Sequence, residues 1–89
     1  MVEIQTFTIK NKLGLHARVA AKLVTVATLY KSKIIFERDG QEVDGKSILG
    51  ILTLACPLGS RITVRAEGVD AGEAVADIGR LFNDKFGED

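Results

Sequence analysis

The sequence predicts an α+β protein in which a mostly antiparallel β-sheet is covered on one face by helices. Apolar residues repeat at every second position in some segments and at every third or fourth position in others, which indicates the order β-α-β-β-α-β-α. A two-residue turn signal joins the second and third strands. With 89 residues, the chain has room for one domain, residues 1–89, built around one core.

The first strand is expected at residues 2–9, which are rich in β-branched and aromatic side chains. The alternation of apolar and polar residues changes phase between Ile4 and Phe7. Because an extra residue in one strand shifts the alternation by one position, this change indicates a β-bulge.

An amphipathic helix is expected next, beginning at His16 or Ala17 and ending at Tyr30, after a turn at Gly14. Its apolar residues fall at helical spacing and are Ala20, Leu23, Val24 and Ala27. Its polar stripe contains Arg18, Lys22 and Thr25. Two antiparallel strands follow at residues 33–38 and 41–44, joined by Asp39 and Gly40, which suit the positive φ angles of a type I′ turn.

The rest of the chain predicts a short helix, a strand and a longer helix. Ser47 is a typical N-cap residue for the apolar segment 48–55, which Pro57 ends. Residues 61–67 alternate between apolar and polar side chains and predict a strand. The last helix begins near Asp70, where acidic side chains suit the helix dipole. Its apolar residues are Ala71, Ala74, Val75, Ile78, Leu81 and Phe82.

Charge and cysteine content exclude several classes of function. The chain is formally neutral, with 12 Lys and Arg and 12 Asp and Glu, and residues 1–50 carry 8 basic against 5 acidic side chains. This surplus is far below the basic footprint of a nucleic-acid-binding protein, but it suits an acidic protein partner. Cys56 is the only cysteine, so we expect no intramolecular disulfide and no metal site of the Cys and His type. We also expect no cofactor. Cys56 is expected to be a small buried apolar residue.

The sequence also predicts where the protein works. Polar residues interrupt the N-terminal segment, which therefore does not resemble a signal peptide. No apolar run approaches the roughly 20 residues of a membrane span. We therefore expect a cytoplasmic protein without membrane insertion.

Residues 40–47 match the P-loop pattern G-x-x-x-x-G-K-S. A P-loop is one continuous backbone nest between a buried strand and a long helix. Here the intervening residues predict a hairpin strand, and the carboxylates of Glu42 and Asp44 would face the phosphates. We therefore reject nucleotide hydrolysis.

His16 is the only histidine, and it precedes the first turn of a predicted helix. Backbone N–H groups at a helix N-terminus are unpaired and favour anions. A phosphoryl group on the imidazole would meet these donors and the guanidinium of Arg18. The alternative is a surface histidine at a helix start without a function.

Ser47 is first an N-cap residue. A phosphate on its hydroxyl would also lie at a helix N-terminus, beside Lys46.

Two segments carry a family resemblance. Residues 14–21, GLHARVAA, resemble the GLHARPAA signature of HPr, the histidine-containing phosphocarrier of the bacterial phosphoenolpyruvate-dependent sugar phosphotransferase system. Residues 46–52, KSILGIL, resemble the second signature of that family, around its regulatory serine. The spacing between the segments and the closing residues 86–88 also fit, so that the resemblance covers essentially the whole chain.

The resemblance implies an open-faced β-sandwich with four antiparallel strands covered on one face by three helices. It also implies that His16 accepts a phosphoryl group from phosphorylated enzyme I, normally on Nδ1, and passes it to enzyme IIA domains. Ser47 would be a regulatory site for a serine kinase or phosphorylase. Val19 stands where the family usually has proline; valine restores a backbone N–H and is expected to loosen the first helical turn.

A carrier of this kind needs an exposed surface that two partners bind in turn. The residues expected on it, besides Arg18, are Leu15, Ala17, Lys22, Lys46, Leu49 and Leu52. We expect a monomer.

A nitrogen-related or regulatory branch of the same phosphotransfer chemistry is the alternative closest to the sugar phosphotransferase carrier. An RNA-binding domain is a further alternative, but its sheet needs exposed aromatic residues, whereas most of the four Phe and one Tyr here lie at core positions.

Overall fold

The computed structural model describes residues 1–88 of the chain. Its elements, in chain order, are β1 (Val2–Thr8), α1 (Ala17–Ala27), β2 (Lys33–Arg38), β3 (Gln41–Asp44), α2 (Ile48–Thr53), β4 (Arg61–Glu67), α3 (Ala71–Asn83) and the short 3₁₀ helix η1 (Lys85–Gly87). The predicted fold class and the order of its strands and helices are confirmed, with η1 added after α3.

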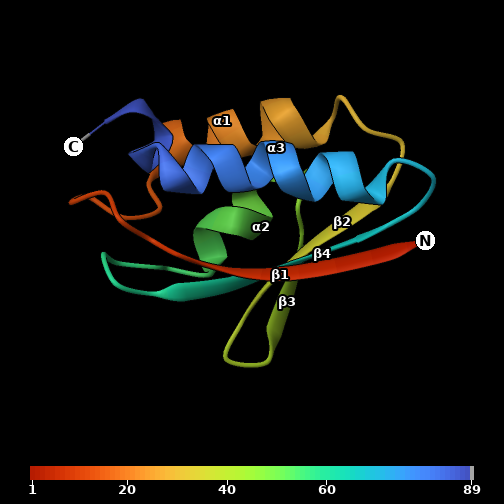
Figure 1. The fold of residues 1–89 in the computed structure, drawn as a ribbon. Coiled ribbons are helices and arrows are strands. Elements are labelled where there is room, and N and C mark those ends of the chain that lie inside the picture. The colour runs from red at the N-terminus through yellow and green to blue at the C-terminus, as the bar shows by residue number, and fades with distance from the viewer. Residues whose placement is uncertain (89) are drawn as a thin grey trace.

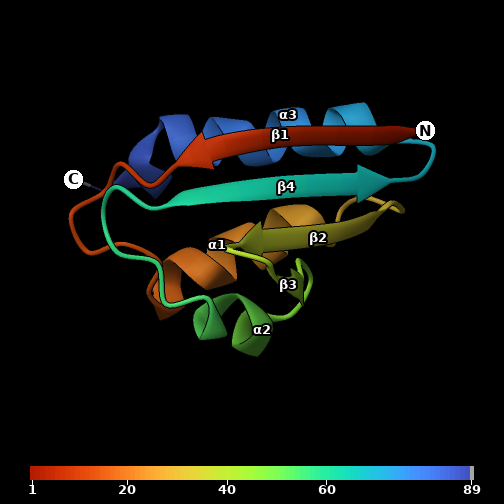
Figure 2. The ribbon, with the colours of Figure 1, turned by 90° about the horizontal axis from the view of Figure 1, so that it is seen from below.

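The strands form one antiparallel sheet in the order β1-β4-β2-β3. The helices lie over one face of this sheet, and its other face is open (Figure 1). α3 packs over β1 and β4, α1 lies beside α3, and α2 packs beside α1 at the edge formed by β3 (Figure 2). The start of α1 and the C-terminal segment therefore lie at the same end of the molecule.

The core lies between the sheet and the helices. Alternate residues of the strands point into it, including Ile34, Phe36, Ile62 and Val64, all of which are fully buried. Aromatic rings fill the part of the core beneath α3 and η1. The ring of Phe82 stacks on Phe7 with a centroid distance of 5.0 Å, and Phe86 meets Phe82 edge-on, also at 5.0 Å.

The β-bulge predicted in β1 is absent from the strand, so this prediction was wrong. β1 pairs with β4 in continuous register, from Val2 opposite Glu67 to Thr8 opposite Arg61. The alternation changes phase because Val2 and Ile4 lie on the open face of the sheet, where they are exposed, whereas Phe7 points toward the helices. The apolar residues of β1 thus face both sides of a regular strand.

Two other boundaries follow from local backbone geometry. The hairpin turn has positive φ at both Asp39 (52°) and Gly40 (84°), as the type I′ prediction requires. The first helix ends at Ala27 and not at Tyr30. Residues 28–30 form a turn, in which the N–H of Tyr30 donates to the carbonyl of Ala27 at 3.2 Å.

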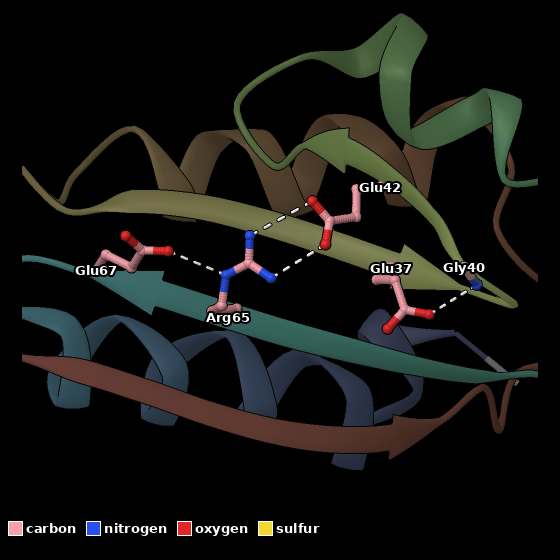
Figure 3. A network of polar contacts seen from close by, with 5 residues as sticks. All are labelled: Glu37, Gly40, Glu42, Arg65 and Glu67. Atoms are coloured by element: carbon pink, nitrogen blue, oxygen red, sulfur yellow. Dashed lines mark hydrogen bonds and ion pairs between the residues drawn. The ribbon is translucent and has the colours of Figure 1, made fainter.

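Charged side chains cover part of the open face (Figure 3). Arg65 on β4 reaches across β2 to both carboxylate oxygens of Glu42 on β3, at 3.1 and 3.4 Å, and also binds Glu67 at 3.0 Å. The hydrogen bond and charge of Arg65 lower the pKa of Glu42. The four Phe side chains are buried and Tyr30 is half-buried, so the open face lacks the aromatic platform that the RNA-binding alternative needs.

Cys56 is buried, as expected, and burial raises the pKa of its thiol. Among residues 1–88, no helix combines the length and the apolar character that crossing a membrane would require.

Asp70 joins the start of α3 to the connection between α1 and β2. Its carboxylate accepts hydrogen bonds from the Ser32 hydroxyl at 2.5 Å, from the Ser32 N–H at 3.0 Å and from the Lys31 N–H at 2.9 Å. These donors, the Ser32 hydroxyl foremost, lower the pKa of Asp70 below its ordinary value of 3.8. Because the folded-state pKa is depressed, the ionised carboxylate stabilises the fold above pH 3.8, and this stabilisation is lost as the pH falls through the lower folded-state pKa.

We therefore predict that Asp70→Asn lowers the urea midpoint of unfolding at neutral pH, and that the difference from the parent narrows in acid. Asp39→Asn is the matched control, because Asp39 is exposed in the hairpin turn and asparagine tolerates its left-handed backbone. A difference between parent and Asp70→Asn that is constant from neutral to strongly acidic pH would contradict this role.

Candidate functional site

His16 is the N-cap residue of α1. Its backbone is extended, with φ −100° and ψ 178°, and its carbonyl accepts the N–H of Ala20 at 2.9 Å. No side chain among residues 1–88 caps this end of the helix. The first turn of α1 therefore keeps backbone N–H groups available to an anion, as the sequence predicts. Ala17 and Arg18, at the start of the helix, are exposed.

The imidazole of His16 is held by a carboxylate from the other end of the chain. Its Nε2 lies 2.8 Å from Oε1 of Glu88, and the two side chains are 28% and 17% exposed. The same Oε1 atom accepts a hydrogen bond from Nδ2 of Asn11 at 2.9 Å. The hydrogen bonds from His16 and Asn11 lower the pKa of Glu88, and the positive charge of Arg18 contributes.

Asn11 is fully buried and connects three parts of the site. Its Nδ2 donates to the Gly14 carbonyl at 2.8 Å as well as to Glu88. A flipped amide would place Oδ1 against two acceptors, so these neighbours determine its orientation. From the sequence alone, Asn11 had no role and Glu88 was included only among the closing residues 86–88.

Glu88 reaches His16 because the chain turns sharply after α3. Lys85, Phe86 and Gly87 all have left-handed backbone, with φ of 53°, 56° and 75°. The buried ring of Phe86 anchors the turn, and the ammonium of Lys22 donates to the Phe86 carbonyl at 2.5 Å. Lys22, expected to face partners, therefore holds the C-terminal segment.

The loop before His16 is held against residues 56–57. The N–H of Leu15 donates to the Cys56 carbonyl at 2.9 Å. Leu15 is only 6% exposed and belongs to the core, so its expected place on a docking surface was wrong. Sequence spacing placed it beside His16 but did not show that this loop folds inward. Val19 is also fully buried and belongs to the core; the loosened first turn expected from valine stays a prediction.

The second predicted site lies on α2. Ser47 is the N-cap, since its Oγ accepts the Gly50 N–H at 3.0 Å, which confirms the capping prediction. The ammonium of Lys46 donates to the Tyr30 carbonyl at 2.8 Å. Leu52 is half-buried and packs against the core, whereas Leu49 is 77% exposed.

Three more exposed apolar side chains lie in or next to these segments in the sequence and were missed by sequence reasoning. They are Leu13, Ile48 and Leu58. Leu13 precedes Gly14, Leu58 follows Pro57, and Ile48 lies on α2. Periodicity could not find the two loop residues, because their exposure depends on the contact between the loops.

Comparisons with known proteins agree on one family. The family model described as "PTS HPr component phosphorylation site" matches residues 4–84. The phosphocarrier protein HPr of Cupriavidus necator is 44% identical over 81 residues, which are 91% of each chain. The crystal structure of HPr-C-His from Thermoanaerobacter tengcongensis superimposes with a TM-score of 0.94 at 42% identity and covers 98% of both chains. A structure described as an HPr dimer from the same organism has a TM-score of 0.79 at 45% identity, with coverage of 90% of this chain and 92% of that one.

The loop contact at Gly14 provides a test of how the site is positioned. A Cβ on Gly14, whose φ is +71°, would lie 2.4 Å from the Cys56 carbonyl oxygen and 2.9 Å from Pro57 Cα. We predict that Gly14→Ala lowers the free energy of unfolding by about 3 kcal/mol or more, because backbone strain adds to a clash with backbone atoms. Denaturant unfolding measures this loss.

Gly59→Ala is the matched control. Gly59 also has positive φ, +92°, but a Cβ there meets no atom within 4 Å. It should lose only the strain contribution, about 1 kcal/mol. Equal losses for the two variants would show that the close approach at Gly14 is unimportant.

Proposed function

Because this chain belongs to the HPr family of the bacterial phosphoenolpyruvate-dependent sugar phosphotransferase system, we propose that His16 is the residue that carries the phosphoryl group. The protein is a phosphoryl carrier that is itself transiently phosphorylated on histidine, and not an enzyme. The observation that carries the assignment to His16 is its place at the uncapped start of α1, with the ring 28% exposed.

The proposed transfer requires only one nucleophilic nitrogen and a site for an anion. A ring nitrogen of His16 attacks phosphorus, the new P–N bond forms, and the bond to the donor breaks with its electron pair left on the donor. The phosphoryl oxygens then meet the backbone N–H groups of the first turn of α1 and the guanidinium of Arg18. Transfer to the acceptor reverses these steps. The donor and acceptor in this proposal are enzyme I and enzyme IIA domains.

Both partners are proposed to bind one surface around His16. Ala17 and Arg18 are exposed and support this surface. It is also supported by the exposed apolar side chains of Leu13, Ile48, Leu49 and Leu58, which lie on three segments. Apolar patches with a charged rim are typical of transient interfaces. The proposal treats residues 1–89 as one domain of a cytoplasmic protein. It treats the carrier as a monomer, because a surface that binds two partners in turn must be free between transfers.

We predict that His16→Ala abolishes enzyme I-dependent labelling by phosphoenolpyruvate while circular dichroism stays unchanged, because the side chain lies outside the core. Labelling of the alanine variant at the level of the parent would exclude His16 as the carrier residue.

Arg18→Ala should slow single-turnover transfer roughly tenfold to a hundredfold, since one charge-assisted contact to phosphate contributes about 1.5 to 3 kcal/mol. Its stability should change little, because the side chain is exposed. Arg65→Ala, on the open face of the sheet (Figure 3), is the matched control and should transfer at the parent's rate. Equal rates for both variants would remove Arg18 from the site.

Ser47 is proposed as a regulatory phosphorylation site, modified by a serine kinase, whose phosphate opposes phosphorylation of His16. Its hydroxyl lies at the start of α2, next to the exposed Ile48 and Leu49. A phosphate there adds about −1.5 to −2 charges to a surface that we expect to meet an acidic partner. Binding of that partner should weaken because of repulsion.

Ser47→Asp is predicted to weaken enzyme I binding, more strongly at low salt, because salt screens repulsion between exposed charges. Ser47→Asn caps a helix equally well without the charge, so it should bind like the parent. Ser47→Ala should also bind normally but lose about 1 kcal/mol of stability. If calorimetry at low salt gives the same affinity for the Asp and Asn variants, the charge effect does not exist.

A further inference from the structure

The hydrogen bonds around Glu88 determine which nitrogen of His16 carries the proton. Oε1 of Glu88 is within hydrogen-bond distance of two groups, Asn11 Nδ2 at 2.9 Å and His16 Nε2 at 2.8 Å. The amide nitrogen can only donate, so Oε1 must accept there. The lowered pKa of Glu88 keeps its carboxyl ionised at neutral pH, and an ionised carboxylate accepts from both neighbours. Nε2 is therefore the protonated nitrogen of a neutral ring.

The orientation of Asn11, on which this assignment depends, is itself determined by its neighbours. Its Nδ2 serves both Gly14 and Glu88, while its buried Oδ1 has no hydrogen-bond partner within residues 1–88. Leaving a buried acceptor unpaired is unfavourable. The fold nevertheless keeps this orientation, because a flipped amide would place Oδ1 against two other acceptors, the Gly14 carbonyl and the Glu88 carboxylate.

We propose that Glu88, held by Asn11, is a positioning residue that keeps the proton of His16 on Nε2 and thereby presents the lone pair of Nδ1 to the incoming phosphorus. The inference rests on the proposed role of His16 as the phosphoryl carrier. It adds the reason why Nδ1 rather than Nε2 reacts, and it assigns the selection of this nitrogen to the C-terminal segment.

The transfer then needs no movement of a proton. The lone pair of neutral Nδ1 forms the P–N bond, the bond from phosphorus to the donor breaks, and its electron pair remains on the donor. The ring becomes a cation that retains its Nε2 proton, and the Glu88 carboxylate compensates the charge. On transfer to the acceptor, the P–Nδ1 bond breaks and its electron pair returns to Nδ1, which restores the neutral ring.

The same contact disfavours attachment to the other nitrogen. A phosphoryl group on Nε2 would have to displace Glu88, and its negative charges would then lie beside an ionised carboxylate that Asn11 still holds. Like charges at hydrogen-bond distance repel strongly in a site that is partly shielded from water. Glu88 therefore accepts the hydrogen bond that keeps the proton on Nε2, and it blocks this side of the ring.

The test is the tautomer of His16, read from the ¹⁵N shifts of its ring in labelled protein at about pH 9, where an imidazole is neutral. In the parent, the proton should reside on Nε2. In Glu88→Ala, the ratio of the Nε2–H to the Nδ1–H form should fall by about tenfold, the effect of losing one charge-assisted hydrogen bond. Glu88→Gln, which keeps an acceptor without the charge, should be intermediate.

Glu3→Ala is the matched control. Glu3 is exposed on β1 near the N-terminus, at the end of the sheet opposite to the C-terminal segment (Figure 2), so its removal should leave the ratio unchanged. An unchanged ratio in Glu88→Ala, or a parent ring protonated mainly on Nδ1, would overturn the proposal. This measurement needs no phosphorylation, so it does not depend on partner proteins.

A second measurement separates this inference from the proposed function. After phosphorylation of the parent by phosphoenolpyruvate and enzyme I, ³¹P and ¹⁵N spectra identify the nitrogen that is bonded to phosphorus. Phosphate on Nδ1 is the expected result. Phosphate on Nε2 would overturn the role of Glu88 and leave His16 as the carrier, whereas an unmodified His16 would overturn the proposed function itself.

Discussion

Burial of the Phe86 ring is the packing interaction on which the candidate site depends. The ring closes the end of the core against Phe82, and the left-handed backbone of residues 85–87 reverses the chain after α3. Non-glycine residues adopt such a backbone only where tertiary contacts outweigh the local cost. Because the buried ring provides these contacts, Glu88 arrives at His16 although 72 residues separate the two in sequence.

The strands and helices were predictable because each depends on a local pattern. The hairpin turn needs only two residues that tolerate positive φ, and the start of α2 needs only a capping hydroxyl, so both were found correctly. Ile4 and Leu15 show where local patterns fail. An apolar side chain in a strand can face the core or the open side of a sheet, and a leucine next to the candidate histidine can point inward. Both outcomes depend on packing against distant segments.

Some residues of the candidate site could likewise be predicted from local sequence, and others could not. His16 and Arg18 could be proposed as site residues because a helix start is visible in the sequence, and the family resemblance supports this proposal. Asn11 and Glu88 were not found as site residues, because neither lies in a motif for hydrogen bonding to a histidine. Their contact joins residues 77 positions apart, and it exists only once η1 has packed. Sequence spacing therefore pointed to His16 as the candidate but not to the groups that hold its ring.

The structure thus holds the Nε2 side of the His16 ring against Glu88, and in the proposed carrier the other nitrogen takes the phosphoryl group. Nuclear Overhauser contacts between the His16 ring protons and the Glu88 methylene protons, recorded before and after phosphorylation, test this account most directly. The contacts should be present in both states, since Glu88 stays on Nε2 while Nδ1 carries the phosphoryl group. Contacts that disappear on phosphorylation, with Glu88 displaced from the ring, would contradict it.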